Sequence, residues 1–208
     1  MEDMLKSKQP KREIVIGVTG HRWIEETREI HAAIDQVTER ILQTYPHHML
    51  MVLSPLAQGA DRVIAKRLLR NQGTKLTAIL PIPLEKYLTD FPSDESKIEF
   101  HHLLDQAEEI IELPHPTSRD EAYAAAGRYI LDHCDLLIAI WDGQVAKGKG
   151  GTGEIVHIAR ERCLPIAWIQ HVQKNHDVGE GVYQDERVDR IRFERFSPQS
   201  SLPDDGEK

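Results

Sequence analysis

The part of the chain best suited to hold a ligand follows a strand-like apolar run over residues 136–141. The run ends in an acidic turn, and a glycine-rich loop then leads into a helix that we expect to begin near Thr152. Glycine lets the backbone approach a ligand closely, while the helix start adds unpaired N–H groups and the positive end of its dipole. This arrangement predicts a site for an anion, above all a phosphate. The residues offered to the ligand are Asp142, Gly143, Gly150, Gly151, Thr152 and Gly153.

A second junction of this kind follows the first apolar run, residues 14–18, and reads Thr19-Gly20-His21-Arg22. Its glycine permits close approach, and the planar guanidinium of Arg22 suits a phosphate with two parallel hydrogen bonds. A simpler interpretation stays open: Arg22 is merely exposed at the start of a helix, and His21 beside it has its hydrogen bonds satisfied within the protein. We expect Thr19, Gly20, His21 and Arg22 to bind the ligand.

A third junction reads Gln58-Gly59-Ala60-Asp61-Arg62 and also enters a helix. Asp61 either stabilises the N-terminus of its own helix or accepts hydrogen bonds from a ribose. We place Gln58, Gly59, Asp61 and Arg62 among the ligand-binding residues, because ligands bind at the carboxyl ends of parallel strands, where all three junctions would lie.

Strand-like and helix-like segments alternate over residues 13–170. The helices show apolar stripes, such as Ile30, Ile34, Val37 and Ile41. Ser118 and Glu121 have the spacing of a capping box, which opens a further helix over 122–133. The alternation predicts a single α/β domain with a doubly wound, mostly parallel Rossmann-like sheet and helices on both faces. The expected strands are 14–18, 49–53, 76–80, 109–113, 136–141 and 165–169.

The remaining segments are expected to be less regular. Residues 1–12 read as a disordered lead, and 171–208 as a C-terminal extension with a disordered acidic end. Within that extension, 188–196 alternates arginine with apolar residues and is either an edge strand or a helix. The segment 85–95 reads as a loop.

Composition narrows the function classes. A net charge of -8 and only 6% aromatic residues argue against nucleic-acid binding, which needs a basic groove and stacking rings. No apolar run approaches the roughly 20 residues of a membrane span, so we expect a cytoplasmic protein without membrane contact. Cys134 and Cys163 read as reduced, buried packing residues. No metal or cofactor is expected, because no His/Cys cluster has zinc spacing.

The three junctions together resemble the SLOG superfamily, which includes the Lonely Guy cytokinin-activating enzymes, the DNA-processing DprA-like proteins and small YpsA-like proteins. The resemblance rests on Gly17-Val18-Thr19-Gly20-His21-Arg22, on Gln58-Gly59-Ala60-Asp61-Arg62, and on the stretch from Cys134 to Gly143 followed by Gly150-Gly151-Thr152. It spans about residues 13–170 and implies a Rossmann-like fold that binds a nucleotide or nucleotide derivative, together with a homodimer.

In enzymatic members the resemblance implies hydrolysis of the N-glycosidic bond of a nucleoside monophosphate, with Glu154 and Arg128 as catalytic residues. Lonely Guy enzymes read Pro-Gly-Gly-x-Gly-Thr-x-x-Glu, whereas here Glu154 follows Thr152 by two residues and Arg128 is displaced by about two positions. Three functions therefore stay open: a nucleotide-binding protein or sensor, a phosphoribohydrolase, and, with least support, a DprA-like binder of single-stranded DNA.

Overall fold

The computed structural model describes residues 12–114, 118–145, 150–172 and 187–196. Nearly all of the expected N-terminal lead and the whole acidic end lie outside these residues, as do Lys147 and Lys149 in the glycine-rich loop.

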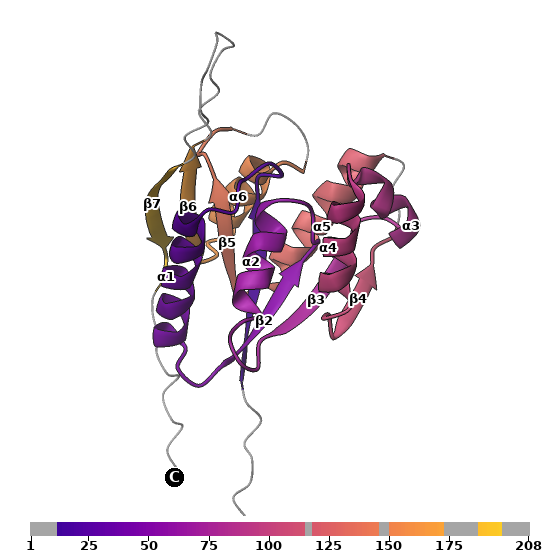
Figure 1. The fold of residues 1–208 in the computed structure, drawn as a ribbon. Coiled ribbons are helices and arrows are strands. Elements are labelled where there is room, and N and C mark those ends of the chain that lie inside the picture. The colour runs from indigo at the N-terminus through magenta and orange to yellow at the C-terminus, as the bar shows by residue number, and fades with distance from the viewer. Residues whose placement is uncertain (1–11, 115–117, 146–149, 173–186, 197–208) are drawn as a thin grey trace, which may run out of the picture.

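One seven-stranded sheet, in the order β4-β3-β2-β1-β5-β6-β7, runs through the described chain (Figure 1). All neighbours are parallel except β6 and β7. The predicted fold class, a doubly wound and mostly parallel Rossmann-like sheet, is confirmed. The strands are β1 (Glu13–Gly20), β2 (Met49–Ser54), β3 (Lys75–Leu80), β4 (Glu109–Glu112), β5 (Leu136–Trp141), β6 (Ile166–Val172) and β7 (Arg187–Glu194).

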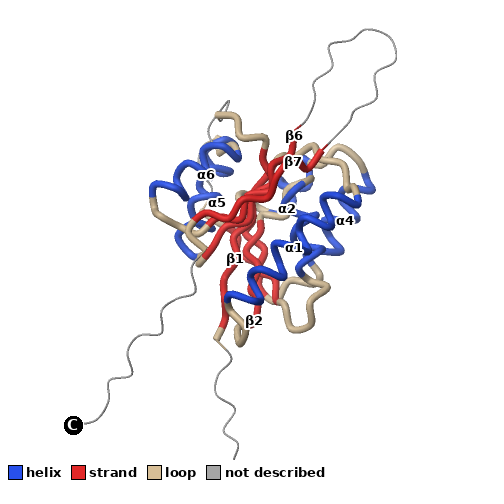
Figure 2. The backbone as a smooth tube through the Cα atoms, turned by 90° about the vertical axis from the view of Figure 1, so that its left-hand side faces the viewer, coloured by secondary structure: helices blue, strands red, loops and turns tan. Residues whose placement is uncertain are grey.

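Helices cover both faces of this sheet (Figure 2). One face carries α1 (Arg28–Thr44), α2 (Ala60–Leu68) and α4 (Asp94–Leu104), and the other carries α5 (Arg119–His133) and α6 (Thr152–Glu161). The segment expected as a loop over 85–95 is instead mostly helical: α3 (Leu84–Tyr87) is followed by a 3-10 turn, and α4 begins at Asp94. Pro83 stands at the N-cap of α3, a position where the missing proline N–H does no harm.

The core forms where apolar strands meet the apolar stripes of the helices. Ile30, Ile34, Val37 and Ile41 are all buried on the inner face of α1, as their spacing predicts. Strands β1, β2 and β5 contribute side chains with no exposed area, because both faces of the sheet are covered. The Oγ of Ser118 accepts a hydrogen bond from the N–H of Glu121 at 3.2 Å, which confirms Ser118 as the N-cap, although α5 begins at Arg119 rather than at the expected residue 122.

The open alternative for residues 188–196 is decided in favour of a strand. β7 pairs antiparallel with β6 at the sheet edge, and Ile191 and Phe193 pack against the main core. Two further expectations concern the cysteines: Cys134 is buried, but the expectation for Cys163 was wrong, because it is exposed at a left-handed residue (φ 58°) after α6.

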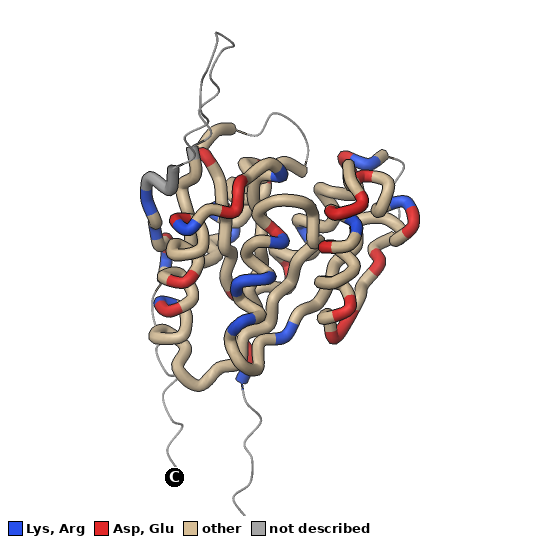
Figure 3. The backbone as a smooth tube through the Cα atoms, in the orientation of Figure 1, with Lys and Arg blue, Asp and Glu red and all other residues tan. Residues whose placement is uncertain are grey.

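Charged residues of both signs are interspersed on the helical surface seen in Figure 3. Helix α2 is the basic element among them, and its Lys66 and Arg67 pair with Glu99 of α4 and Asp35 of α1. Over the described ranges, no helix combines the length and apolarity needed to cross a bilayer. Within the same ranges, no three His, Cys, Asp or Glu side chains gather as a metal site would require.

Candidate functional site

A cleft of about 450 Å3 opens at the carboxyl ends of β1 and β5. The chain order reverses here, since β2 flanks β1 on one side and β5 flanks it on the other. Such a switch point is where ligands bind in open α/β sheets. Ten of the residues proposed from sequence line the cleft, namely Thr19, Gly20, His21, Arg22, Asp61, Asp142, Gly150, Gly151, Thr152 and Gly153.

Six proposed residues are outside this lining. Gln58, Gly59 and Arg62 line a smaller hollow of about 140 Å3 on the other side of Arg22. Gly143 lies behind the cleft against the Trp168 ring. The two residues proposed as catalytic, Glu154 and Arg128, are also not part of the lining, and Arg128 is exposed on α5.

A second hollow of about 450 Å3 lies at the opposite ends of the strands from the cleft, where β2 begins. Its lining includes His47, His48 and Asn71 but no Lys, Arg, Asp or Glu side chain. It has no helix N-terminus either, so this second hollow lacks the groups that select an anion.

The N-terminus of α6 forms one wall of the cleft. Its N-cap residue, Gly151, makes no side-chain capping bond. Among the described residues, no acceptor binds the N–H groups of Gly151, Thr152 or Gly153. Gly150 has φ 74°, and a Cβ there would lie 2.7 Å from the backbone nitrogen of Ala124, so only glycine brings this loop so close to α5. The first turn of α6 is therefore open to an anion.

Glu154 binds the loop that precedes its own helix. Its Oε2 accepts a hydrogen bond from the N–H of Gly150 at 2.5 Å, which closes the loop onto the first turn of α6. Glu154 is the third residue of α6, and the helix dipole favours a carboxylate in the first turn.

His21 joins three elements at the end of β1. Its N–H donates to the carbonyl of Ile140 at 3.1 Å, and its own carbonyl accepts from the N–H of Ala60 at 3.0 Å. The ring Nε2 lies 3.1 Å from the backbone nitrogen of Asp142 and 3.2 Å from its Oδ1. His21 thus holds the ends of β1 and β5 and the start of α2 together around the cleft.

Arg22 stands at the mouth of the cleft, with its guanidinium 4.8 Å from the centre of the Tyr123 ring. The Tyr123 hydroxyl donates to Asp90, which also forms an ion pair with Arg119. Burial raises the pKa of Tyr123, and the hydrogen bond to Asp90 raises it further. Arg22 therefore rests on an aromatic face that a fixed network orients.

Tyr123 and Trp141 line the cleft and were missed by the sequence analysis. Trp141 is the last residue of β5, so its place at the carboxyl edge was available from the strand prediction. Tyr123 gave no such signal, since it reaches the cleft from α5, which follows β4 at the far side of the sheet.

Asp61 lines the cleft from the start of α2 and is only 6% exposed. The N–H of Ala57 donates to its carboxyl group, but Oδ1 has no hydrogen-bond partner among the described residues. Burial raises the pKa of Asp61 from 3.8 to about 8, and the charge of Arg22 only partly opposes the rise. An unpaired buried polar atom is costly in a folded protein, so the open oxygen of Asp61 calls for an explanation.

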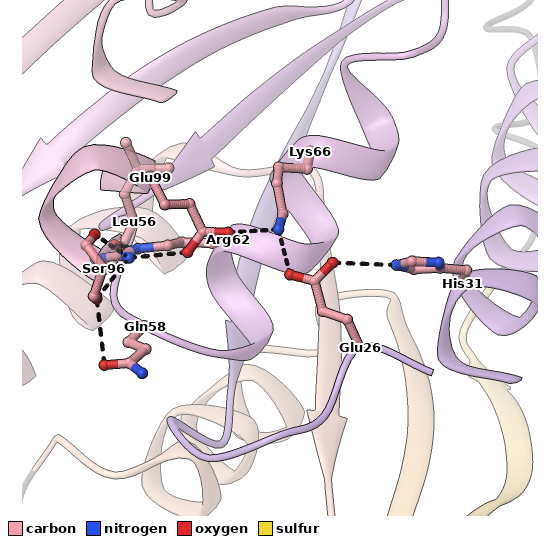
Figure 4. Close-up of polar contacts among 8 residues, drawn as sticks. All are labelled: Glu26, His31, Leu56, Gln58, Arg62, Lys66, Ser96 and Glu99. Atoms are coloured by element: carbon pink, nitrogen blue, oxygen red, sulfur yellow. Dashed lines mark hydrogen bonds and ion pairs between the residues drawn. The ribbon is translucent and has the colours of Figure 1, made fainter. Parts of the chain in front are cut away.

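Arg62 is buried beside the cleft rather than in it, with 1% of its surface exposed. Its Nε donates to the carbonyl of Leu56 at 2.9 Å, and its Nη1 donates to Ser96 and to Glu99 (Figure 4). From Glu99 the ion pairs continue through Lys66 to Glu26, and so tie α4, α2 and the β1–α1 loop together. Arg62 thus fixes the turn that presents Asp61.

We predict that Gly59→Ala destabilises the protein by several kcal/mol more than Gly73→Ala. Both glycines have positive φ (91° and 85°), so both substitutions incur a backbone cost of roughly 1–3 kcal/mol. At Gly59 the new Cβ would also lie 2.2 Å from the carbonyl oxygen of Arg22, whereas nothing lies within 4 Å at Gly73. Urea unfolding of the two variants measures the difference, and equal losses would show that the contact with Arg22 is not tight.

Comparisons with known proteins give a likeness of fold. No family model and no curated protein matches the chain. Two solved structures of the molybdenum cofactor carrier protein from Chlamydomonas reinhardtii are similar to it, each at 18% identity over 76% of both chains, with TM-scores of 0.44 and 0.41.

Proposed function

We propose that the cleft binds a phosphate-bearing small molecule of the nucleotide type, as a binding protein or sensor. The observation that carries this proposal is the convergence of the open first turn of α6 and the Arg22 guanidinium on one cleft at the switch point of the sheet. Backbone N–H groups and an arginine fork are the two groups that proteins most often use to hold phosphate. The resemblance to the SLOG superfamily points to the same ligand class.

The rest of the cleft suits the remainder of such a ligand. Ala126, Ile130 and Trp141 give it an apolar wall, while Gln144 and Thr19 add polar groups. Pockets for small organic ligands commonly pair an apolar lining with a few polar groups that fix orientation. We therefore place the phosphate on residues 151–153 and the organic part against β1, β5 and α5.

Binding is favoured over N-glycosidic hydrolysis by the position of the proposed catalytic pair. The Glu154 carboxylate already accepts the Gly150 N–H, and Arg128 is exposed away from the lining. A hydrolase mechanism would need a carboxylate at the reacting carbon, and turnover would then be lost in Glu154→Gln. Incubating AMP and ADP-ribose with the protein and analysing the mixtures for free base by chromatography tests this: we expect both compounds to stay intact.

The Arg22→Met variant tests the binding proposal. We expect its dissociation constant for the best ligand to rise about 10- to 100-fold, because a charge-assisted hydrogen bond contributes roughly 1.5–3 kcal/mol. Arg28→Met is the matched control, since Arg28 is an exposed arginine on α1 outside the lining. Isothermal titration calorimetry with AMP and ADP-ribose measures both variants. Equal affinities would remove Arg22 from the site.

By the same resemblance we propose that the protein is a homodimer, which sedimentation equilibrium of the full chain tests directly. Single-stranded DNA is the weakest alternative, given the net charge of -8. A gel shift that shows salt-sensitive retardation of an oligonucleotide would revive it.

A further inference from the structure

Asp61 is the feature of the cleft that phosphate binding alone does not explain. A carboxylate beside an anion site opposes binding, yet Asp61 is buried at the cleft with one oxygen unpaired. The charged and titratable groups that act on it are Arg22 from the β1–α1 loop, Arg62 from its own helix and Tyr87 from α3. None of them forms a hydrogen bond or ion pair with Asp61 among the described residues.

The charges that line the cleft depend on the state of this one group. Apart from His21 and Tyr123, the ionisable side chains in the described lining are Arg22, Asp61 and Asp142. With Asp61 ionised, two carboxylates stand against one guanidinium among these described residues, which opposes an anion. With Asp61 neutral, Arg22 balances Asp142 within the same set, and the N–H groups in the first turn of α6 favour the anion.

We propose that Asp61 binds the ligand as a neutral carboxylic acid, which donates its proton to an acceptor oxygen of the bound anion, so that the cleft takes up the anion and a proton together. The proposal rests on the proposed function and specifies its chemistry. It replaces the role considered from sequence, in which an ionised Asp61 accepts hydrogen bonds from a ribose.

The neutral-acid role of Asp61 also predicts how the affinity of the cleft depends on pH. The pKa of Asp61 in the free protein is raised to about 8 by burial, so the acid form prevails at neutral pH. A bound anion raises this pKa further, because it disfavours the carboxylate. Affinity for AMP should therefore be level between about pH 7 and pH 8 and fall about tenfold per pH unit above it. The phosphate of AMP itself, with a second pKa near 6, does not titrate in that range.

Calorimetry of AMP binding at pH 9 in two buffers of different ionisation enthalpy tests the proposal, because the difference in heat gives the protons taken up. We expect uptake of nearly one proton by the wild type and by the control Asp35→Asn, an exposed α1 variant. We expect none in Asp61→Asn, whose neutral amide does not titrate. At pH 9 this variant should bind AMP about tenfold more tightly than the wild type.

The outcomes separate this inference from the proposed function. AMP binding by the wild type without proton uptake, or weaker binding by a folded Asp61→Asn at every pH, overturns the neutral-acid role and leaves the phosphate site standing. Absence of AMP and ADP-ribose binding at every pH from 6 to 9 overturns the proposed function, and this inference falls with it.

Discussion

Asp61→Asn should gain about 3–4 kcal/mol of stability relative to the wild type as the pH rises from 5 to 8. Burial raises the pKa of Asp61 from 3.8 to about 8, so between these values the folded protein retains a proton that the unfolded chain has released. The stability that this proton provides is complete below pH 3.8 and is lost as the pH rises through 8, at about 1.4 kcal/mol per pH unit. Asparagine has no such proton.

Urea unfolding of both proteins at pH 5, 6, 7 and 8 measures this difference, and other titrating groups cancel because both proteins contain them. Asp35→Asn is the control of opposite sign, since its hydrogen bond with Arg67 lowers the pKa of Asp35. The contribution of Asp35 to stability is lost only as the pH falls below 3.8, so we expect Asp35→Asn and the wild type to differ by a constant amount between pH 5 and 8. Parallel pH profiles of the wild type and Asp61→Asn would show that Asp61 is ionised in the folded protein.

Arg62→Met should lower the free energy of unfolding by about 3–5 kcal/mol, because each buried acceptor left without its donor costs roughly 1–3 kcal/mol. The substitution leaves the carbonyls of Leu56 and Ser96 without their donor, and strands Glu99 with Lys66 alone. It also removes a guanidinium that lies 4.3 Å from the centre of the Phe91 ring.

Arg67→Met is the matched control for this variant, because it removes the same type of side chain further along α2. Arg67 pairs with Asp35 at the surface, where water replaces the lost contact, so we expect little or no change. Urea unfolding at pH 7 measures both variants. A loss below about 1 kcal/mol for Arg62→Met would contradict the structural role of the Arg62 network.

The spacing of apolar residues, together with the glycines and prolines that end each element, was enough to predict the fold. In a sheet covered on both faces, each strand is a short apolar run. Ile138 and its neighbours in β5 are such a run, and the stripe of Ile30, Ile34 and Val37 gave α1. The 84–90 segment was missed because α3 is one turn long and follows two prolines, so local patterns favoured a loop. The cleft forms because β1 and β5 are adjacent in the sheet, and this adjacency depends on the topology of the whole sheet rather than on the sequence of either strand.

In the candidate site, too, some features could be predicted from the local sequence and others depend on the folded chain. Glycine junctions marked the backbone of the cleft, because close approach is a local requirement that glycine alone meets at Gly150. The direction of a long side chain is not local: Arg22 and Arg62 follow similar glycine turns, yet one reaches the cleft and the other is buried against Ser96 and Glu99. The resemblance likewise gave Glu154 a catalytic role, whereas the structure shows its carboxylate bonded to the loop backbone.

The most direct test of the phosphate site is a 15N-edited NMR titration of the full chain with AMP at pH 7, with inorganic phosphate as a second probe. We expect the largest chemical-shift changes at the amides of Gly151, Thr152 and Gly153, produced by both probes and strongly reduced in Arg22→Met. Changes that cluster instead around His47 and His48 at the opposite ends of the strands, or no change at saturating AMP, would contradict a phosphate site at the N-terminus of α6.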